Sequence, residues 1–406
     1  MHSEFDIDEH IQNYWVNQAQ KYGLPINPSI PWEIEAFWNP TKDRPMSTAE
    51  FLSHLTPTSA VSVVLETYER HEVVEERLPK RVRAVFLMLF KRFRHVSQLY
   101  SHLRAEPEDA VLLGYEIDGN GKVQLESYET LRQFINERLA GLWKVLIDAF
   151  LKELVSVLRS EGVSIGSESS EDATFLKAVK GDKEAEYNGY YKANGYKVDM
   201  AVENKHNLPT RIAFLDGNDA EGRCLPDSLQ HLHEIGLLPD RMYIDGGYTS
   251  YENIAIAEIK YGVELSYRIE KDWVINPKGF EGHLRDLYQK HWKDAEFKPK
   301  VSTHYILSFL LTRGHMEEVG AHFRNMRMAE YEEASDSYLD AFHQRNIGEG
   351  FNGYAKDQID LERDVPKGME KVRIHALSRI CCIIVAALTR AQNGVFEDLG
   401  SIAYIV

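Results

Sequence analysis

The stretch Phe342-His-Gln-Arg345-Asn-Ile-Gly-Glu349-Gly-Phe-Asn-Gly-Tyr-Ala-Lys356 carries the strongest pattern in the chain. At about 100° per residue, positions 342, 345, 349 and 356 fall within about 60° of one another on a helix. A carboxylate on such a stripe can bind a divalent metal ion, and flanking cations can bind phosphates. The stretch therefore predicts a helix that contributes to a metal-dependent nucleic-acid site.

Two aspartates upstream stand where strands are expected. Asp245 follows the short apolar run Met242-Tyr-Ile and precedes two glycines, and Asp172 lies in Ser170-Glu-Asp-Ala-Thr-Phe-Leu-Lys-Ala. An Asp at the end of a strand is where α/β sheets place ligands. Asp245 could instead form a turn, and Asp172 could be a solvated surface acid. Glu168 and Glu171 also compete with Asp172 for the same role.

The helical stretch has ordinary alternatives as well. Glu349 could form a surface ion pair with Arg345 four residues earlier, and Arg345 and Lys356 could be plain surface charges. Three glycines, at 348, 350 and 353, disfavour a purely structural helix, because each weakens a helix by roughly 1 kcal/mol. They indicate close approach by another part of the structure, either the sheet or DNA.

Taken together, these segments resemble the DDE transposases of prokaryotic insertion sequences. That family's signature helix reads Y-x2-R-x3-E-x6-K, and this chain has Phe342 in place of the tyrosine. Tyr243-Ile-Asp245-Gly-Gly-Tyr-Thr-Ser resembles the segment around the family's second Asp, and the segment around Asp172 resembles the first. Gly195-Tyr-Lys-Val-Asp199 resembles a G-Y-K-x-H strand, with Asp199 where the family has His. The resemblance covers roughly residues 164 to 393.

The resemblance implies an α/β fold: a ribonuclease-H-like catalytic core, a mixed sheet with flanking helices, preceded by a mainly helical N-terminal region. It implies a DNA-end-binding region at 1–160, a catalytic domain at 161–393 with an insertion around 270–340, and a tail at 394–406. Asp172, Asp245 and Glu349 would be the catalytic residues and hold two Mg²⁺ ions, with Mn²⁺ substituting. One ion activates a water or 3′-hydroxyl and the other stabilises the leaving oxygen.

The expected partners are terminal inverted repeats and target DNA, bound by a homodimer on paired ends. Arg345 and Lys356 would contact phosphates in the core. The N-terminal region carries a basic stripe around the apolar run 84–90, and its candidate DNA-binding residues are Lys80, Arg81, Arg83, Lys91 and Arg92. The net charge of −16 weakens a DNA-binding interpretation without removing it, because local charge meets the phosphates.

Composition predicts a reduced cytoplasmic globular protein, and the resemblance implies association with the nucleoid when the protein is bound to DNA. The chain has 406 residues, enough for two or three domains, and 43% are hydrophobic. The longest apolar run, residues 380–388, is too short to span a bilayer, and no signal peptide is evident. The cysteines, at 224, 381 and 382, have neither disulfide nor zinc spacing.

Local patterns predict the individual elements. Helices are expected within 59–103, over 127–139 and 142–160, from Asp227 to a stop at Gly236, over 251–260 behind a Thr249–Glu252 capping box, and over 374–392. Strands are expected at 196–202 and 210–215, joined as a hairpin, and at 242–245 and 263–269, while 106–121 reads as a loop.

Two other functions compete with a transposase. A catalytically silent DNA-binding descendant would fit the changes at Phe342 and Asp199, but the intact set of three carboxylates argues against it. A metal-independent hydrolase with two carboxylates, such as a glycosidase, would fit the acidic net charge. It leaves the Arg345–Glu349–Lys356 helix unexplained.

Overall fold

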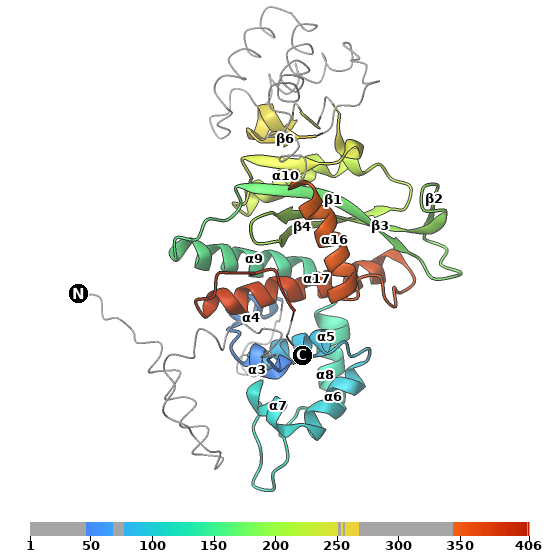
Figure 1. Ribbon diagram of the computed structural model, residues 1–406. Coiled ribbons are helices and arrows are strands. Elements are labelled where there is room, and N and C mark those ends of the chain that lie inside the picture. Colours follow the sequence, from blue (N-terminus) through green and yellow to red (C-terminus); the bar gives the residue numbers. More distant parts are fainter. Residues whose placement is uncertain are drawn as a thin grey trace, which may run out of the picture.

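The computed structural model describes residues 46–67, 77–250, 253–254, 256–267, 344–403 and 405. The predictions for residues 1–45, for the insertion around 270–340 and for Phe342 lie outside this part of the chain. Figure 1 shows the described elements in colour, with a sheet above two long helices and the N-terminal helices below them.

One sheet joins the described strands, and they run in two directions. The strands are β1 (Glu168–Lys177), β2 (Glu186–Asn188), β3 (Ala193–Glu203), β4 (Leu208–Asp216), β5 (Arg241–Ile244) and β6 (Glu264–Ser266). Strand β1 pairs antiparallel with β3 on one side and parallel with β5 on the other; β4 and β2 extend the β3 side and β6 extends the β5 side. This is the ribonuclease-H-like order that the resemblance implied.

The elements of the sheet region follow local signals in the sequence. The predicted hairpin of β3 and β4 is present, and Asn207 in its turn has a φ of 53°, a conformation that asparagine tolerates. Helix α10 (Leu225–Glu234) ends just before Gly236, whose φ of 74° fits a helix stop. The short 3-10 turns η3 (Glu221–Arg223) and η4 (Gly246–Tyr248) flank α10 and β5.

The helix expected after residue 249 differs from its prediction. The Ser250 hydroxyl accepts a hydrogen bond from the Asn253 amide at 3.1 Å, whereas the predicted partner of Thr249, Glu252, lies outside the described residues. The following residues form the π-helix η5 (Ile256–Tyr261), which Gly262 ends with a φ of 69°.

The N-terminal region is helical, as predicted, with one difference. It contains α3 (Thr48–Ser53), α4 (Thr58–Glu66), α5 (Leu78–Phe90), α6 (Val96–Ala105), α7 (Pro107–Leu112), α8 (Tyr128–Gln133) and the π-helix η2 (Phe134–Arg138). The prediction of a loop over 106–121 was wrong for its first half, which is α7. Pro107 at the first helical position and the acids that follow it suit a helix N-terminus.

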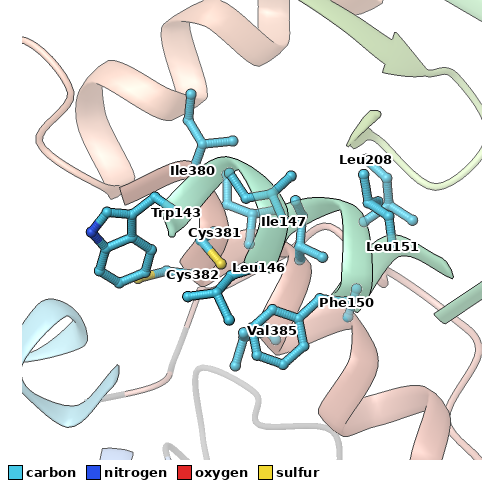
Figure 2. Close-up of a cluster of buried hydrophobic side chains, with 14 of the residues drawn as sticks. Trp143, Leu146, Ile147, Phe150, Leu151, Leu208, Ile380, Cys381, Cys382 and Val385 are labelled. Atoms are coloured by element: carbon cyan, nitrogen blue, oxygen red, sulfur yellow. The ribbon is translucent and has the colours of Figure 1, made fainter. Parts of the chain in front are cut away.

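Two long helices, α9 (Trp143–Ser160) and α17 (Met369–Gln392), form the centre of the hydrophobic core. They lie side by side beneath the sheet (Figure 1), and Figure 2 shows Trp143 of α9 near Cys381 and Cys382 of α17, and Phe150 of α9 near Val385 of α17. The three cysteines are free and buried. Among the described helices, α17 has the length and apolar composition of a membrane span, but most of it is buried inside the fold, so it is a core helix.

The remaining described helix, α16 (Asn346–Gln358), crosses one face of the sheet over β1 and β3 (Figure 1). The strand register divides the side chains of β1 between two faces. Asp172 pairs with Met200, whereas Ala173 pairs with Asp199, so consecutive residues of β1 point to opposite sides. The α16 face carries Asp172, and the other face carries Glu171 and Asp199.

Candidate active site

The sheet places Asp172 and Asp245 next to each other. In the parallel pairing of β1 with β5, Glu171 lies opposite Ile244, so the following residue of each segment is one of the two aspartates. Residues at equal positions in neighbouring parallel strands point to the same face. Asp245 also caps η4, where its carboxylate accepts the Gly246 amide at 2.7 Å. Asp245 therefore forms the turn after β5 and also lies beside Asp172, so its two predicted roles, turn former and site residue, do not exclude each other.

Helix α16 brings Glu349 to the same face because Gly348 allows close packing against β1. A Cβ atom added to Gly348 would lie 3.1 Å from the Ser170 Cβ and 3.6 Å from the Asp172 Cβ. No described atom would lie within 4 Å of a Cβ on Gly350 or Gly353. The sheet, rather than DNA, accounts for the first glycine, and the other two lie on the open side of the helix.

Arg345 joins the second and third carboxylates. One guanidinium nitrogen lies 2.7 Å from an Asp245 carboxylate oxygen, and the other terminal nitrogen lies 2.8 Å from a Glu349 oxygen. The Arg345 side chain is 18% exposed, while those of Asp245 and Glu349 are 53% and 50% exposed. The predicted surface pair of Arg345 with Glu349 thus exists, but it is one half of a bridge across two segments far apart in sequence.

Asp172 is the most enclosed of the three carboxylates. Burial raises the pKa of Asp172 to about 7; a hydrogen bond from the Asn352 amide, at 2.8 Å, opposes this shift, and the negative charges of Glu349 and Asp245 add to it. The three acids are therefore close enough to repel one another. Such a cluster favours binding of a cation, which would stabilise all three charged forms.

The donor set fits the divalent metal ions that the resemblance implies. Hard cations prefer carboxylate and amide oxygens, and the buried side-chain oxygen of Asn352 has no hydrogen-bond partner in the described part of the chain. As the side chains stand, no three His, Cys, Asp or Glu residues among those described are arranged to hold one metal ion. The Arg345 guanidinium instead bridges two of the three carboxylates.

Lys356 lies at the other end of α16, away from the bridge. Its ammonium group pairs with Glu362 at 2.7 Å, and its side chain is one third exposed. Arg345 is the residue that precedes the first turn of α16, and Lys356 lies about two turns beyond Glu349.

The predicted basic stripe is partly internal. Arg81 is buried and pairs with Glu126 at 3.0 Å, and Arg83 donates hydrogen bonds to the Leu55 carbonyl at 2.8 and 3.0 Å. These two arginines hold the helical region together. The other three are more accessible: Lys80 lies over the Tyr115 ring, Lys91 is half-buried, and Arg92 is exposed and reaches Asp360 near the end of α16.

A buried charge network lies behind the site, on the other face of the sheet. Arg211 of β4 pairs with Asp199 and, at 3.2 Å, with Glu171, and the Tyr248 hydroxyl donates a hydrogen bond to Asp199. Burial raises the pKa of Glu171 well above its usual range, and the charge of Asp199 raises it further. The protonated form of Glu171 is therefore favoured, and Asp199 balances the charge of Arg211.

This network explains which of the neighbouring acids belongs to the carboxylate site and why Asp199 stands in place of a histidine, two questions that the sequence left undecided. Glu171 faces away from α16, so Asp172 is the acid that shares a face with Asp245 and Glu349. Asp199, which stands where the family has His, belongs to the buried network and not to the carboxylate site. The signal was present in the sequence, because Asp199 and Arg211 interrupt the apolar pattern of two strands predicted to pair.

A cavity of about 610 Å³ lies elsewhere, between α9, the edge strand β4, α10 and α17. Its lining includes Lys144, Asp148, Phe214, His231 and Arg373, and none of the three carboxylates. The carboxylates instead lie at the surface, where two of them are half-exposed. An open arrangement of this kind can receive a long polymer.

Comparison with known proteins supports the same interpretation. Residues 170–385, a little over half of the chain, match the family model of the transposase DDE domain. No curated protein matches the chain. Among solved structures, the piggyBac transposase synaptic complex with hairpin DNA is similar at 11% identity and a TM-score of 0.28, over 84% of this chain and 78% of that chain. A score that low carries no argument about this chain, so the family match alone supports the interpretation.

Proposed function

This chain belongs to the family of the transposase DDE domain, and on that premise we propose that it is the transposase of an insertion sequence. It binds the terminal inverted repeats of its element, cleaves the DNA strands there by metal-dependent hydrolysis, and joins the 3′-hydroxyl ends to target DNA. One observation carries the proposal: Asp172, Asp245 and Glu349, from three separate segments, meet on one open face of the sheet around a bridging arginine.

Each carboxylate has a part in holding the ions and the strand. Asp172 and Asp245 offer oxygens from neighbouring strands, and Glu349 offers one from the helix above them. Two Mg²⁺ ions, which Mn²⁺ can replace, would supply activation of the attacking oxygen and stabilisation of the leaving oxygen. The raised pKa of Asp172 favours this set, because a carboxylate that repels its neighbours gains most from a nearby cation.

The cations of the chain position the DNA. Arg345 lies directly beside two carboxylates, so when it leaves them it can hold a phosphate of the strand being cut. Lys356 lies farther along the same helix and would contact the backbone next to it. In the N-terminal region, 1–160, phosphate contacts fall to Lys80, Lys91 and Arg92, because Arg81 and Arg83 are committed to internal partners.

The rest of the proposal concerns assembly and place. Two copies act together on paired element ends, in the cytoplasm and on the nucleoid. The family match argues against a metal-independent hydrolase with two carboxylates. A silent DNA-binding descendant stays the second candidate, because the Arg345 bridge neutralises the site without metal and could serve a purely structural role.

The test is cleavage of DNA that carries the ends flanking this gene, with Mg²⁺ or Mn²⁺ and with EDTA. Wild type is compared with Glu349→Gln and with Asp357→Asn, an exposed acid on the same helix for which the described residues provide no ion pair. Metal-dependent nicking by wild type and Asp357→Asn, but not by Glu349→Gln, supports the proposal. Binding without cleavage by any of them favours the silent descendant, and absence of binding overturns both.

A further inference from the structure

The turn that carries Asp245 is held from the face of the sheet away from α16. Asp245 caps η4, and its own side chain is half-exposed, so packing around the carboxylate does not fix its position. Tyr248, three residues later, is fully buried, and its hydroxyl donates a hydrogen bond to Asp199 of β3. Because β1 lies between β5 and β3 in the sheet, the tyrosine reaches across the strand that carries Asp172.

The same network holds β1 next to Asp172. Glu171, the residue before Asp172, points to the face away from α16. Its carboxylate lies 3.2 Å from the guanidinium of Arg211, which also pairs with Asp199. Asp199 therefore connects the two aspartates of the site from behind. Through the arginine it is linked to the residue before the first, and through the tyrosine to the turn that carries the second.

A second set of contacts holds the same turn through η3. Lys197 of β3 pairs with Glu221 at 2.9 Å, which fixes η3 to the sheet. The Asn253 amide then joins η3 to η4, because it donates to the Gly222 carbonyl at 2.8 Å and to the Tyr248 carbonyl at 2.7 Å. The turn is therefore anchored to β3 twice, once through η3 and once through the tyrosine hydroxyl.

The position of Asp245 relative to Asp172 decides whether the two carboxylates can share an ion. Mg²⁺ demands near-ideal octahedral geometry, so ligand oxygens from different strands must be held in fixed positions. Replacing residues that hold metal ligands from behind typically changes metal affinity or activity by roughly 10- to 100-fold. A network that only neutralised Arg211 would need one carboxylate, whereas this one also receives the tyrosine from the turn that Asp245 caps.

We propose that the hydrogen bond from Tyr248 to Asp199 positions Asp245 for metal binding. Both partners are positioning residues, because they act through the backbone of η4 and not by contact with an ion or with DNA. This inference rests on the proposed function and adds to it that the metal affinity of the open face is set from the buried face of the sheet.

The test measures binding of Mn²⁺ to the full chain by calorimetry, without DNA. Tyr248→Phe removes the hydroxyl and keeps the buried ring. Tyr196→Phe is the matched control, because this buried tyrosine of β3 also donates a hydrogen bond to a carboxylate, that of Asp182 at 2.9 Å. Asp182 belongs to neither segment of the site, so the control loses the same kind of hydrogen bond without releasing the turn.

Two replacements of Asp199 test the acceptor. Asp199→Asn keeps a hydrogen-bonding partner for the Tyr248 hydroxyl, whereas Asp199→Ala removes it. In both variants Glu171 stays within 3.2 Å of Arg211 and can serve as its counter-ion, so the buried arginine is not left alone. Urea unfolding of every variant establishes that it is folded. Should Tyr248→Phe not fold, the comparison of Asp199→Ala with Asp199→Asn decides in its place.

We expect Tyr248→Phe and Asp199→Ala to bind Mn²⁺ roughly tenfold more weakly than wild type does. Tyr196→Phe and Asp199→Asn should bind it within about threefold of wild type. The double variant of Tyr248→Phe with Asp199→Ala should bind no more weakly than either single variant, because both remove one hydrogen bond. Wild-type affinity in Tyr248→Phe, an equal loss in Tyr196→Phe, or additive losses in the double variant overturn the proposal.

The same measurements separate this inference from the cleavage proposal. Cleavage of DNA by wild type, with unchanged Mn²⁺ affinity in Tyr248→Phe, overturns the positioning role and leaves the transposase in place. Weaker Mn²⁺ binding by Tyr248→Phe, with no cleavage by wild type, supports the positioning role and contradicts the transposase activity. Absence of Mn²⁺ binding by wild type, or an affinity that Glu349→Gln does not lower, overturns the positioning role, because the ion is then not held by these carboxylates.

Discussion

Replacing Asp199 by Asn tests the charge balance of the buried network, and the expected loss of stability is small. In the native protein burial raises the pKa of Glu171 and so favours its protonated form, which leaves Asp199 to neutralise Arg211. When Asp199 loses its charge, part of the repulsion that raises the pKa of Glu171 disappears. Glu171 already lies 3.2 Å from Arg211, so it can release its proton and become the counter-ion.

The magnitudes follow from which charges stay paired. In Asp199→Asn, the ion pair of Arg211 with Glu171 replaces the ion pair of Arg211 with Asp199. The Tyr248 hydroxyl then donates its hydrogen bond to a neutral amide oxygen instead of a carboxylate, which lowers the free energy of unfolding by about 1–2 kcal/mol. Glu171→Gln replaces one neutral group by another and costs about 1 kcal/mol or less. The double variant leaves Arg211 buried without a carboxylate, which costs about 3–5 kcal/mol.

The assay is urea unfolding of wild type, both single variants and the double variant at neutral pH. The double variant should lose about 1–2 kcal/mol more than the two single variants together, because each carboxylate can compensate for loss of the other. Asp219→Asn, which breaks a largely exposed pair with Arg223, is the control and should change stability by less than about 1 kcal/mol. Additive losses, or a full loss in Asp199→Asn alone, would refute the reasoning.

Three further predictions concern α16 and the acid stability of the fold. Arg345→Gln removes two ion pairs with half-exposed acids, worth about 0.2–1 kcal/mol each, so the variant should bind Mn²⁺ about 2- to 30-fold more tightly than wild type does. The affinity is measured by calorimetry, with Arg223→Gln as a control that should bind Mn²⁺ as wild type does. Weaker binding of Mn²⁺ by Arg345→Gln would contradict the prediction. Gly348→Val should lower the free energy of unfolding by about 1–3 kcal/mol, because its side chain would meet β1. Gly350→Ala, with no described atom near its Cβ, should raise the free energy of unfolding by about 0.5–1 kcal/mol. Equal effects of the two substitutions would show that Gly348 is not specially close to the sheet. Burial lowers the pKa of His375 from 6.5 to about 4, so the folded state favours the neutral imidazole. The stability that depends on this neutral form is fully present above pH 6.5 and is lost, by about 2–3 kcal/mol, as the pH falls towards 4. In urea unfolding at a series of pH values, His375→Gln should show a smaller loss of stability over this range.

Local patterns in the sequence were enough for elements whose neighbours are close along the chain. The β3–β4 hairpin, the stop of α10 at Gly236 and the buried helix α17 were predicted from alternation, a glycine and an apolar run. The error over residues 106–121 has a local cause too. An Asp118-Gly-Asn-Gly turn was extended backwards over Pro107, although a proline followed by acids starts a helix at least as readily.

The candidate site depends on relations that no local pattern contains. Glu171 and Asp172 are adjacent acids, and only the pairing of β1 with β3 and β5 decides which of them faces α16. A shift of the register by one residue would exchange them. Likewise, the basic stripe gave no indication that Arg81 is buried, because its partner Glu126 lies 45 positions away on another segment.

The acidic net charge and a DNA substrate are compatible because charges act over a short range. At physiological ionic strength an exposed charge is screened within about 8–10 Å, so phosphates respond to the nearest side chains and not to a total of −16. Two of the site acids are bridged by Arg345, so part of the negative charge at the site is compensated within the protein. A DNA strand that approaches the carboxylates would therefore meet less negative charge than the total for the chain suggests. On the proposed function, these acids would hold divalent ions that attract the strand, and Arg345 would then be available to hold a phosphate.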